Sequence, residues 1–260
     1  MKKFSVKDNI KHWNKYALSN QNNKQGATFD AALSELEDFF IIMELKKIKP
    51  RSMLDIGCGN GQRTTMFSNY VKGKTIGIDY SENMIKQAKT IRNHNLFFYC
   101  DDITKYSTDS LFDVIISCRC IINQSTHAAQ LELFKKLHGM LKPKGHLIIA
   151  EASDEGLKNL NRIRKEFGLK NIEEHWFNLH IKEKVIIPKI SKLFKIKTIK
   201  RLGLYYYIAR VIQPTNTYPV EPKRGSVLDE IAKKTQLLFF NEESLFEQFG
   251  RHLLINFQKK

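Results

Sequence analysis

A glycine-rich turn is the segment of this sequence whose residue types point most clearly to chemistry. Gly57-Cys58-Gly59-Asn60-Gly61 follows the apolar run Ser52–Ile56, which predicts a strand, and precedes Gln62–Tyr70, which predicts a helix. Glycine tolerates positive φ and lets a ligand approach the backbone, and the first turn of the helix offers free N–H groups. The turn is not a phosphate-binding loop, because no Lys-Ser/Thr pair follows. It also departs from the dinucleotide motif Gly-x-Gly-x-x-Gly, because its third glycine comes one residue early.

Acidic residues stand at the tips of the next two predicted strands. Asp79 ends the apolar run Thr75–Asp79, and a carboxylate there can accept both hydroxyls of a ribose. Asp101-Asp102-Ile103 follows the run Leu96–Cys100, where an acidic side chain can accept a hydrogen bond from an adenine amino group. Residues at three successive strand ends would then contact three parts of one adenosine ligand.

The elements that must position these residues alternate between short apolar runs and helical patterns. This alternation predicts an α/β fold, with a parallel sheet covered by helices on both faces. Ser81 is the expected N-cap of a helix over Ser81–Thr90, and Thr28 or Asp30 that of a helix ending at Pro50. The other expected elements are strands at Phe112–Cys118, His146–Glu151, Phe194–Leu202 and Leu253–Phe257, and helices at Thr126–Leu141, Tyr205–Ile212 and Val227–Phe240.

The composition is that of an ordinary globular chain with a strong positive charge. Of 260 residues, 42% are hydrophobic and 27% are charged, which suffices for a buried core. Lys and Arg number 43 against 27 Asp and Glu, giving a net charge of +16, so a nucleic-acid partner must be considered. The excess is mostly lysine and is densest between Lys182 and Arg201, which is typical of a solvated surface. We therefore regard nucleic acid as the less favoured partner.

Cysteine use and targeting signals favour a cytoplasmic protein. The four cysteines, at positions 58, 100, 118 and 120, lack metal-ligand spacing and are expected to be reduced thiols. No apolar run reaches the roughly 18 residues of a membrane span, and the basic start is not followed by a signal-peptide core. We expect neither a bound metal nor a membrane span.

The ordered motifs resemble those of class I S-adenosylmethionine-dependent methyltransferases. The matching residues are Leu54-Asp55-Ile56-Gly57-Cys58-Gly59-x-Gly61, Gly77-Ile78-Asp79-x-Ser81-x-x-Met84, Asp102-Ile103, Phe112-Asp113-Val114-Ile115 and Leu141-Lys142-Pro143-x-Gly145. The resemblance implies a Rossmann-like seven-stranded fold, a mostly parallel doubly wound sheet with helical lid insertions. It divides the chain into an N-terminal helical cap (1–45), a cofactor-binding core (46–155), a helical lid (156–192) and a C-terminal part (193–260). That last part would complete the sheet and carry an insertion at 204–249.

The resemblance also assigns S-adenosylmethionine as cofactor and gives each matching residue a role. Gly57, Cys58, Gly59 and Gly61 would lie against the methionine and ribose parts of the cofactor. Asp55 would support the turn, and Asp79 would hold the ribose. The remaining implied contacts are Tyr80 and Met84 beside the adenine, Asp102 and Ile103 at its edge, and Cys118 beside the methionine moiety. Asp101 is included with this set, the alternative being a solvated neighbour of Asp102.

The first residues are expected to form a polar connection and a lid. Trp13 and Tyr16 would share one face of a short helix beginning near Asp8, and we expect them to contact the cofactor. The run Gln21–Gly26 predicts a connecting loop. The alternative to a lid that closes on the cofactor is a helix docked permanently on the core.

The segment after the fourth strand bears on the methyl acceptor. Ser117–Asn123 has neither the proline pair and aromatic residue of nucleic-acid amine methyltransferases nor a Pro-Cys nucleophile. A second, narrower resemblance is to bacterial small-molecule methyltransferases of sugar and surface-polysaccharide tailoring. The residues that carry it are Arg119–Asn123, Gln130, Glu151-Ala152-Ser153, Leu160-Asn161-x-x-Arg164, and Leu204–Ile212 with Pro214. An RNA methyltransferase and a non-catalytic cofactor-binding protein remain the alternatives.

Candidate acceptor residues lie past strand ends or in the expected lid. The set is Arg119, Asn123, Glu151, Asn161, Arg164, Asn178 and Tyr206, which suits a small polar molecule, neutral or anionic. Arg164 is expected to pair with Glu151 or with an anionic group on the acceptor. Transfer would be direct and in line to oxygen or nitrogen, helped by a base among His127, His175, His180 and Glu151.

Overall fold

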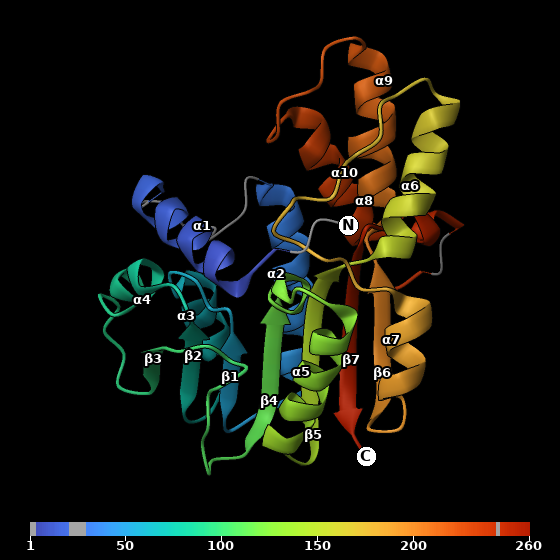
Figure 1. The fold of residues 1–260 in the computed structure, drawn as a ribbon. Helices are drawn as coiled ribbons and strands as arrows, with labels where there is room; N and C mark the ends of the chain where they lie inside the picture. Colours follow the sequence, from blue (N-terminus) through green and yellow to red (C-terminus); the bar gives the residue numbers. More distant parts are fainter. Residues whose placement is uncertain (1–3, 21–29, 243–244) are drawn as a thin grey trace.

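One seven-stranded sheet organises the molecule. The computed structural model describes residues 4–20, 30–242 and 245–260, and the strand order is β3-β2-β1-β4-β5-β7-β6 (Figure 1). All strands run parallel except β7, which is antiparallel to both β5 and β6. The strands are β1 Met53–Ile56, β2 Thr75–Asp79, β3 Leu96–Cys100, β4 Phe112–Cys118, β5 Leu141–Ala152, β6 Phe194–Arg201 and β7 His252–Lys259. The predicted mostly parallel α/β sheet is confirmed.

Both faces of the central strands are buried, and successive side chains of each strand point to opposite sides, whereas the edge strands β3 and β6 are partly exposed. Along β4, Ile115 joins the core under α5 (His127–Met140) and α7 (Glu183–Ile190), whereas Val114 and Ile116 join the core on the opposite face. That second face is covered by α2 (Ala31–Ile48) and α3 (Gln62–Ser68), and α4 (Glu82–Ala88) packs beside β3. The apolar runs at β1 and β4 therefore become almost continuously buried strands.

Side-chain caps fix where several helices begin. Ser81 accepts a hydrogen bond from the Met84 N–H at the start of α4, as predicted, and Asp30 accepts one from Leu33 N–H at the start of α2. Ser5 and Asp8 form a capping box on α1 (Val6–Ser19), which begins close to the predicted position. The predicted Gln21–Gly26 connection and Thr28 lie outside the described residues.

A group of helices stands over the β5–β7 side of the sheet. Between β6 and β7 the chain forms α8 (Gly203–Tyr207), a π-helical turn (Ile208–Ile212), α9 (Gln213–Thr217), α10 (Val227–Leu238) and a 3-10 turn (Leu245–Phe249). They lie beside α6 (Asp154–Glu166), while α1 crosses the strand ends on the other side (Figure 1). Tyr205, Ala209 and Ala232 of this insertion are fully buried against α2 and the sheet.

Three sequence expectations are wrong in detail. Residues 142–145 predict a turn before the expected strand His146–Glu151, but β5 begins at Leu141 and these residues form a bulge within it. The run Gln213–Gly225 contains three prolines and predicts a loop, but residues 213–217 are helical and continue directly from the π-helical turn. Residues 156–192 are not one helical lid: α6 and α7 are separated by irregular backbone, and Ile186 and Ile190 of α7 pack into the sheet core.

Among the described residues, no helix combines the length and the apolar character needed to cross a membrane.

Candidate functional site

A cavity of about 540 Å³ opens at the edge of the sheet where the parallel strands end. Because β7 runs antiparallel, its first residues reach this same edge. The cavity wall draws on α1, on the turns after β1 to β4, and on the insertion between β6 and β7. This is the location at which open α/β sheets bind their ligands.

The glycine-rich turn forms the floor of one half of the cavity. Gly57 and Gly59 both have positive φ, 68° and 54°. A Cβ on Gly57 would lie 2.8 Å from the Cβ of Cys120, so no side chain fits there. A Cβ on Gly59 would meet only the Met84 sulfur at 4.0 Å, so this glycine presents open backbone to the cavity. Such a cradle fits a ligand that lies against the chain itself.

Two buried carboxyl groups hold this turn. Asp79 accepts hydrogen bonds from the Gly59 N–H at 3.0 Å and from the Ser81 N–H at 2.8 Å. Asp55 accepts one from the Thr64 hydroxyl at 2.6 Å, which ties β1 to α3. Burial raises the pKa of each carboxyl group to about 6. A carboxylate has about four lone-pair sites, so Asp79 can accept further bonds from a ribose.

Except for Gly61, which packs against Phe98 and Ala88, the other predicted cofactor residues line the same cavity. They are Trp13, Tyr16, Cys58, Tyr80, Met84, Asp101, Asp102, Ile103 and Cys118. Asp101 accepts the Asp102 N–H at 2.7 Å, and Asp102 accepts the Thr104 N–H at 2.9 Å, so both side chains also order the turn after β3. The cradle, the acidic strand tips and the flanking Tyr80 and Met84 together fit S-adenosylmethionine.

Helix α1 is docked across the cavity by polar contacts on both sides. The Asn14 side-chain oxygen accepts the Ser81 hydroxyl at 2.8 Å and the Asn83 N–H at 3.2 Å. On the other side, Trp13 Nε1 donates to Asn123 Oδ1 at 3.3 Å, and the Trp13 ring lies 5.4 Å from that of Phe177. The helix therefore spans the cavity from the half lined by the glycine-rich turn to a second half, on the side of Asn123 and Phe177.

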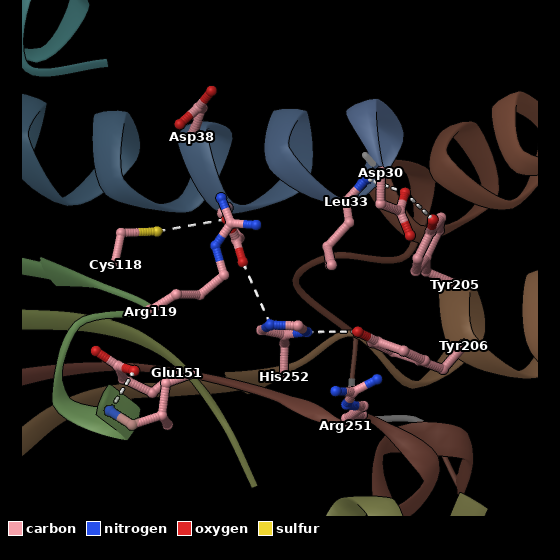
Figure 2. A network of polar contacts seen from close by, with 12 residues as sticks. Asp30, Leu33, Asp38, Cys118, Arg119, Glu151, Tyr205, Tyr206, Arg251 and His252 are labelled. Carbon is pink, nitrogen blue, oxygen red and sulfur yellow. Dashed lines mark hydrogen bonds and ion pairs between the residues drawn. The ribbon is translucent and has the colours of Figure 1, made fainter. Parts of the chain in front are cut away.

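An ion-pair network borders the second half of the cavity (Figure 2). Glu37 on α2 is fully buried and lies 3.2 Å from Arg63 and 3.5 Å from Arg119. Arg63 also pairs with Asp38 at 2.6 Å, and its guanidinium lies 2.8 Å from the Cys118 sulfur. Burial raises the pKa of Cys118, so this residue is a thiol and not a nucleophilic thiolate.

A tyrosine–histidine pair adjoins this network. The Tyr206 hydroxyl is hydrogen-bonded to His252 Nδ1, and His252 Nε2 faces Glu37 at 3.5 Å (Figure 2). Burial and the charge of Arg251 lower the pKa of His252 well below its usual value, so the imidazole is neutral. With its proton on Nε2 toward Glu37, Nδ1 accepts the phenol proton. The Tyr206 oxygen then keeps its lone pairs for a ligand.

The structure brings five of the predicted acceptor and base residues to the cavity. They are Arg119, Asn123, His175, Asn178 and Tyr206. Arg119 adopts a left-handed conformation, φ 57°, and its carbonyl accepts the Asn123 amide at 2.7 Å. Sequence reasoning missed Glu37, Arg63, Arg251 and His252. The last two were open to prediction, because an antiparallel final strand must begin at the edge where the parallel strands end.

Glu151 is not a cavity residue, contrary to prediction. Its fully buried carboxyl group accepts the Ser117 hydroxyl at 2.5 Å and the N–H groups of Cys120, Ile121 and Ile122 at 3.0, 3.0 and 3.3 Å. Burial raises the pKa of Glu151 to about 7 against these hydrogen bonds. It organises the loop that carries Arg119 and Asn123, and it does not face a ligand.

Four further predicted residues also lie outside the cavity wall. Arg164 is buried and donates to the Lys170 carbonyl at 2.9 Å and to that of Arg210, so the expected Glu151 pair is wrong. The Asn161 side chain donates a hydrogen bond to the Ile172 carbonyl and accepts one from the Ile172 N–H. It therefore closes the loop that follows α6, because the polar face of α6 is turned to this loop. His127 bonds Gln130 at 3.0 Å, and His180 is buried with a strongly lowered pKa, which makes it a poor base.

The chain is similar to known methyltransferases in sequence and in fold. A model of the methyltransferase domain family matches residues 49–202. Malonyl-(acyl-carrier protein) O-methyltransferase of Bacillus anthracis is 27% identical over 172 residues, covering 58% of this chain and 64% of the relative. Phosphoethanolamine N-methyltransferase 1 of Arabidopsis thaliana is 30% identical over 132 residues, covering 49% of this chain and 26% of the relative. The chain thus spans less than two thirds of the length of either relative.

Solved structures share the fold over nearly the whole chain. The N-methyltransferase NodS of Bradyrhizobium japonicum, in complex with S-adenosyl-L-homocysteine, has a TM-score of 0.58 at 15% identity, covering 95% of this chain and 98% of that one. Magnesium protoporphyrin IX methyltransferase of Synechocystis has a TM-score of 0.62 at 12% identity, covering 98% and 100%. At these identities the likeness is one of fold.

Proposed function

Because the chain belongs to the methyltransferase domain family, we propose that it transfers the methyl group of S-adenosylmethionine to an oxygen or nitrogen atom of a small polar acceptor. The observation that carries this proposal is one cavity with two chemically different halves. Glycine backbone and aspartates from the ends of β1 to β3 line one half. Arginine, histidine and tyrosine side chains from the insertion and from the start of β7 line the other.

The first half supplies contacts for each part of the cofactor. Asp79 would accept the ribose hydroxyls, Gly59 would let the ligand lie on the backbone, and Tyr80 with Met84 would flank the adenine. S-adenosylmethionine brings an activated sulfonium methyl group, so the protein need not activate the donor. The principal task of these residues is to fix its position and orientation, which accounts for much of the rate in such reactions.

The second half supplies contacts for an acceptor. The Tyr206 hydroxyl donates its own proton in a hydrogen bond to His252. Its oxygen can therefore accept a hydrogen bond from a hydroxyl or amine of the methyl acceptor. Asn178 and His175 from the segment before α7, together with Asn123, add neutral polar groups on the same wall. The rings of Trp13 and Phe177 are in contact beside these polar groups and cover this part of the cavity, which favours a compact acceptor over a polymer. We take a sugar, a nucleotide-linked sugar or a phosphorylated metabolite of bacterial surface-polysaccharide synthesis as the candidate acceptors.

The relatives support the reaction type while differing in the acceptor. One is named as an O-methyltransferase of malonyl-(acyl-carrier protein) and another as an N-methyltransferase of phosphoethanolamine. Both oxygen and nitrogen chemistry therefore occur among proteins similar to this one. The acceptor half, rather than the shared cofactor half, must decide between them.

A labelling experiment tests the proposal. Purified protein is titrated with S-adenosyl-L-homocysteine by calorimetry, then incubated with methyl-labelled S-adenosylmethionine and separate pools of sugar nucleotides, phosphorylated metabolites and RNA. We expect binding, and label in a small-molecule pool. Asp79→Ala should lower both, whereas Asp109→Ala, an exposed aspartate outside the cavity, should change neither. Absence of binding would reject the function, label in RNA alone would reject the small acceptor, and binding without turnover in any pool would indicate a non-catalytic protein.

A further inference from the structure

Five arginines line the cavity, and they differ in how their charges are neutralised. Arg63 contacts Glu37 and Asp38, Arg119 shares Glu37 at 3.5 Å, and Arg210 contacts Asp30 and Asp229. Among the residues that the structure describes, neither Arg224 nor Arg251 has a carboxylate within ion-pair distance. The carboxylates at this end of the cavity are thus already engaged by three of the cations.

Arg251 is the better placed of the two free cations. It directly precedes β7 and is half-buried, and its Nε atom is fully buried without a hydrogen-bond partner among the described residues. Its Nη2 atom lies 3.4 Å from His180 Nε2. A buried donor without an acceptor is unfavourable, and more so when it is charged, so its retention calls for a ligand or another reason.

The charge of Arg251 acts on the groups that surround it. Burial lowers the pKa values of His175, His180 and His252, and Arg251 lowers each of them further. These imidazoles are therefore neutral, so they add hydrogen-bonding groups without adding charge. The Glu174 carboxylate also interacts with Arg251 electrostatically, but from beyond ion-pair distance, and it accepts the His180 N–H.

We propose that Arg251, with Arg224 at the mouth of the cavity, binds an anionic group of the methyl acceptor, a carboxylate or a phosphate. Arginine suits both groups, because its planar fork donates two parallel hydrogen bonds to a pair of oxygens. The neutral Tyr206–His252 pair lies on the same wall and would hold an uncharged part of the acceptor. This assignment rests on the proposed function and narrows it to anionic acceptors.

The inference is tested on protein saturated with S-adenosyl-L-homocysteine, so that the cofactor half is filled. Inorganic phosphate and succinate are titrated separately by calorimetry at constant ionic strength, into the wild type and three variants. The variants are Arg251→Gln, Arg224→Gln and, as a matched control, Arg162→Gln, an exposed α6 arginine outside the cavity. The two probes distinguish a phosphate from a carboxylate source.

We expect one probe to bind saturably, with affinity reduced about tenfold or more in Arg251→Gln and severalfold in the more exposed Arg224→Gln. Arg162→Gln should bind like the wild type. No saturable binding, or equal binding in all variants, would overturn the inference while leaving the methyltransferase proposal intact. A matching loss of S-adenosyl-L-homocysteine affinity in Arg251→Gln would also overturn it, by assigning Arg251 to the cofactor. Failure of the wild type to bind S-adenosyl-L-homocysteine would instead reject the proposed function itself.

Discussion

Replacing Glu151 by glutamine separates a structural carboxyl group from a catalytic one. The wild-type carboxyl group accepts four hydrogen bonds, from the Ser117 hydroxyl and from the N–H groups of Cys120, Ile121 and Ile122. Glutamine can reproduce three of these with its oxygen, but its amide nitrogen would then face the Ile122 N–H. Two donors facing each other in a buried site leave both unsatisfied, so Glu151→Gln should destabilise by about 1–3 kcal/mol at pH 5.

The pH dependence gives the sharper part of this prediction. Burial raises the pKa of Glu151 from 4.5 to about 7, so between these values the folded state binds more protons than the unfolded state. The stability of the wild type must then fall as pH rises through this window, by up to about 3 kcal/mol at 1.36 kcal/mol per pKa unit. Glutamine does not titrate. The wild-type advantage should therefore shrink from pH 5 to pH 8, and can reverse in sign.

Urea unfolding followed by tryptophan fluorescence at pH 5, 6, 7 and 8 measures this difference. Glu132→Gln, an exposed glutamate on α5, is the matched control and should give a small, constant difference. Methyl transfer by Glu151→Gln should persist wherever the variant is folded. A wild-type advantage that stays constant with pH would refute the burial argument. Normal stability with abolished turnover would show that Glu151 acts on the acceptor.

Three other substitutions probe the cofactor site, a buried arginine outside the cavity and the docking of α1. Asp79→Asn should weaken S-adenosyl-L-homocysteine binding by about tenfold to a hundredfold in calorimetry. Wild-type affinity should also decline below pH 6 as Asp79 is protonated; unchanged affinity would reject the ribose assignment. Arg164→Ala should lower the free energy of unfolding by about 2–4 kcal/mol, because two carbonyl groups lose a buried donor, and a large change in affinity instead would place it in the site. Trp13→Ala should speed amide exchange in α1 and weaken cofactor binding, whereas equal exchange would mean that Trp13 does not hold the helix.

Local patterns in the sequence predicted the cofactor half well. Short apolar runs, the glycine-rich turn and caps such as Ser81 depend on residues close together in the chain, so their geometry follows from spacing alone. The aspartates at the ends of β2 and β3 reach the cavity because parallel strands all end at one edge. Each of these features needs only a strand, its direction and the following turn.

The direction in which the Glu151 side chain points was predicted wrongly. Its place near the end of β5 suggested a cavity residue, but side chains alternate along a strand, and Glu151 shares the face of Leu147 and Ile149. That face lies under α5 and the loop after β4, away from the ligand. Both alternating sets of side chains of β5 are apolar and buried, so the sequence of the strand alone does not show which side faces the cavity.

The acceptor half depends on contacts between distant segments. Glu37 on α2 meets Arg119 after β4 and His252 at the start of β7. No spacing rule links these positions, because their meeting requires the strand order and the packing of the insertion. Arg164 likewise points inward and donates to the carbonyl groups of residues 170 and 210. These carbonyl groups come close to Arg164 only in the folded chain, so the sequence does not reveal the contact.

The position of β7 has a consequence for how this protein acquires its activity during synthesis. β7 leaves the ribosome after the other six strands of this sheet, yet it pairs in the interior of the sheet, between β5 and β6. Residues 53–118 can build the cofactor half from contacts that are already available, but Arg251 and His252 arrive with the final strand. Pairings so distant in sequence form slowly, and until they form the edge of β5 is open to other chains. A nascent chain would thus become competent for the donor before it is competent for the acceptor, and chaperone dependence should concentrate in that interval.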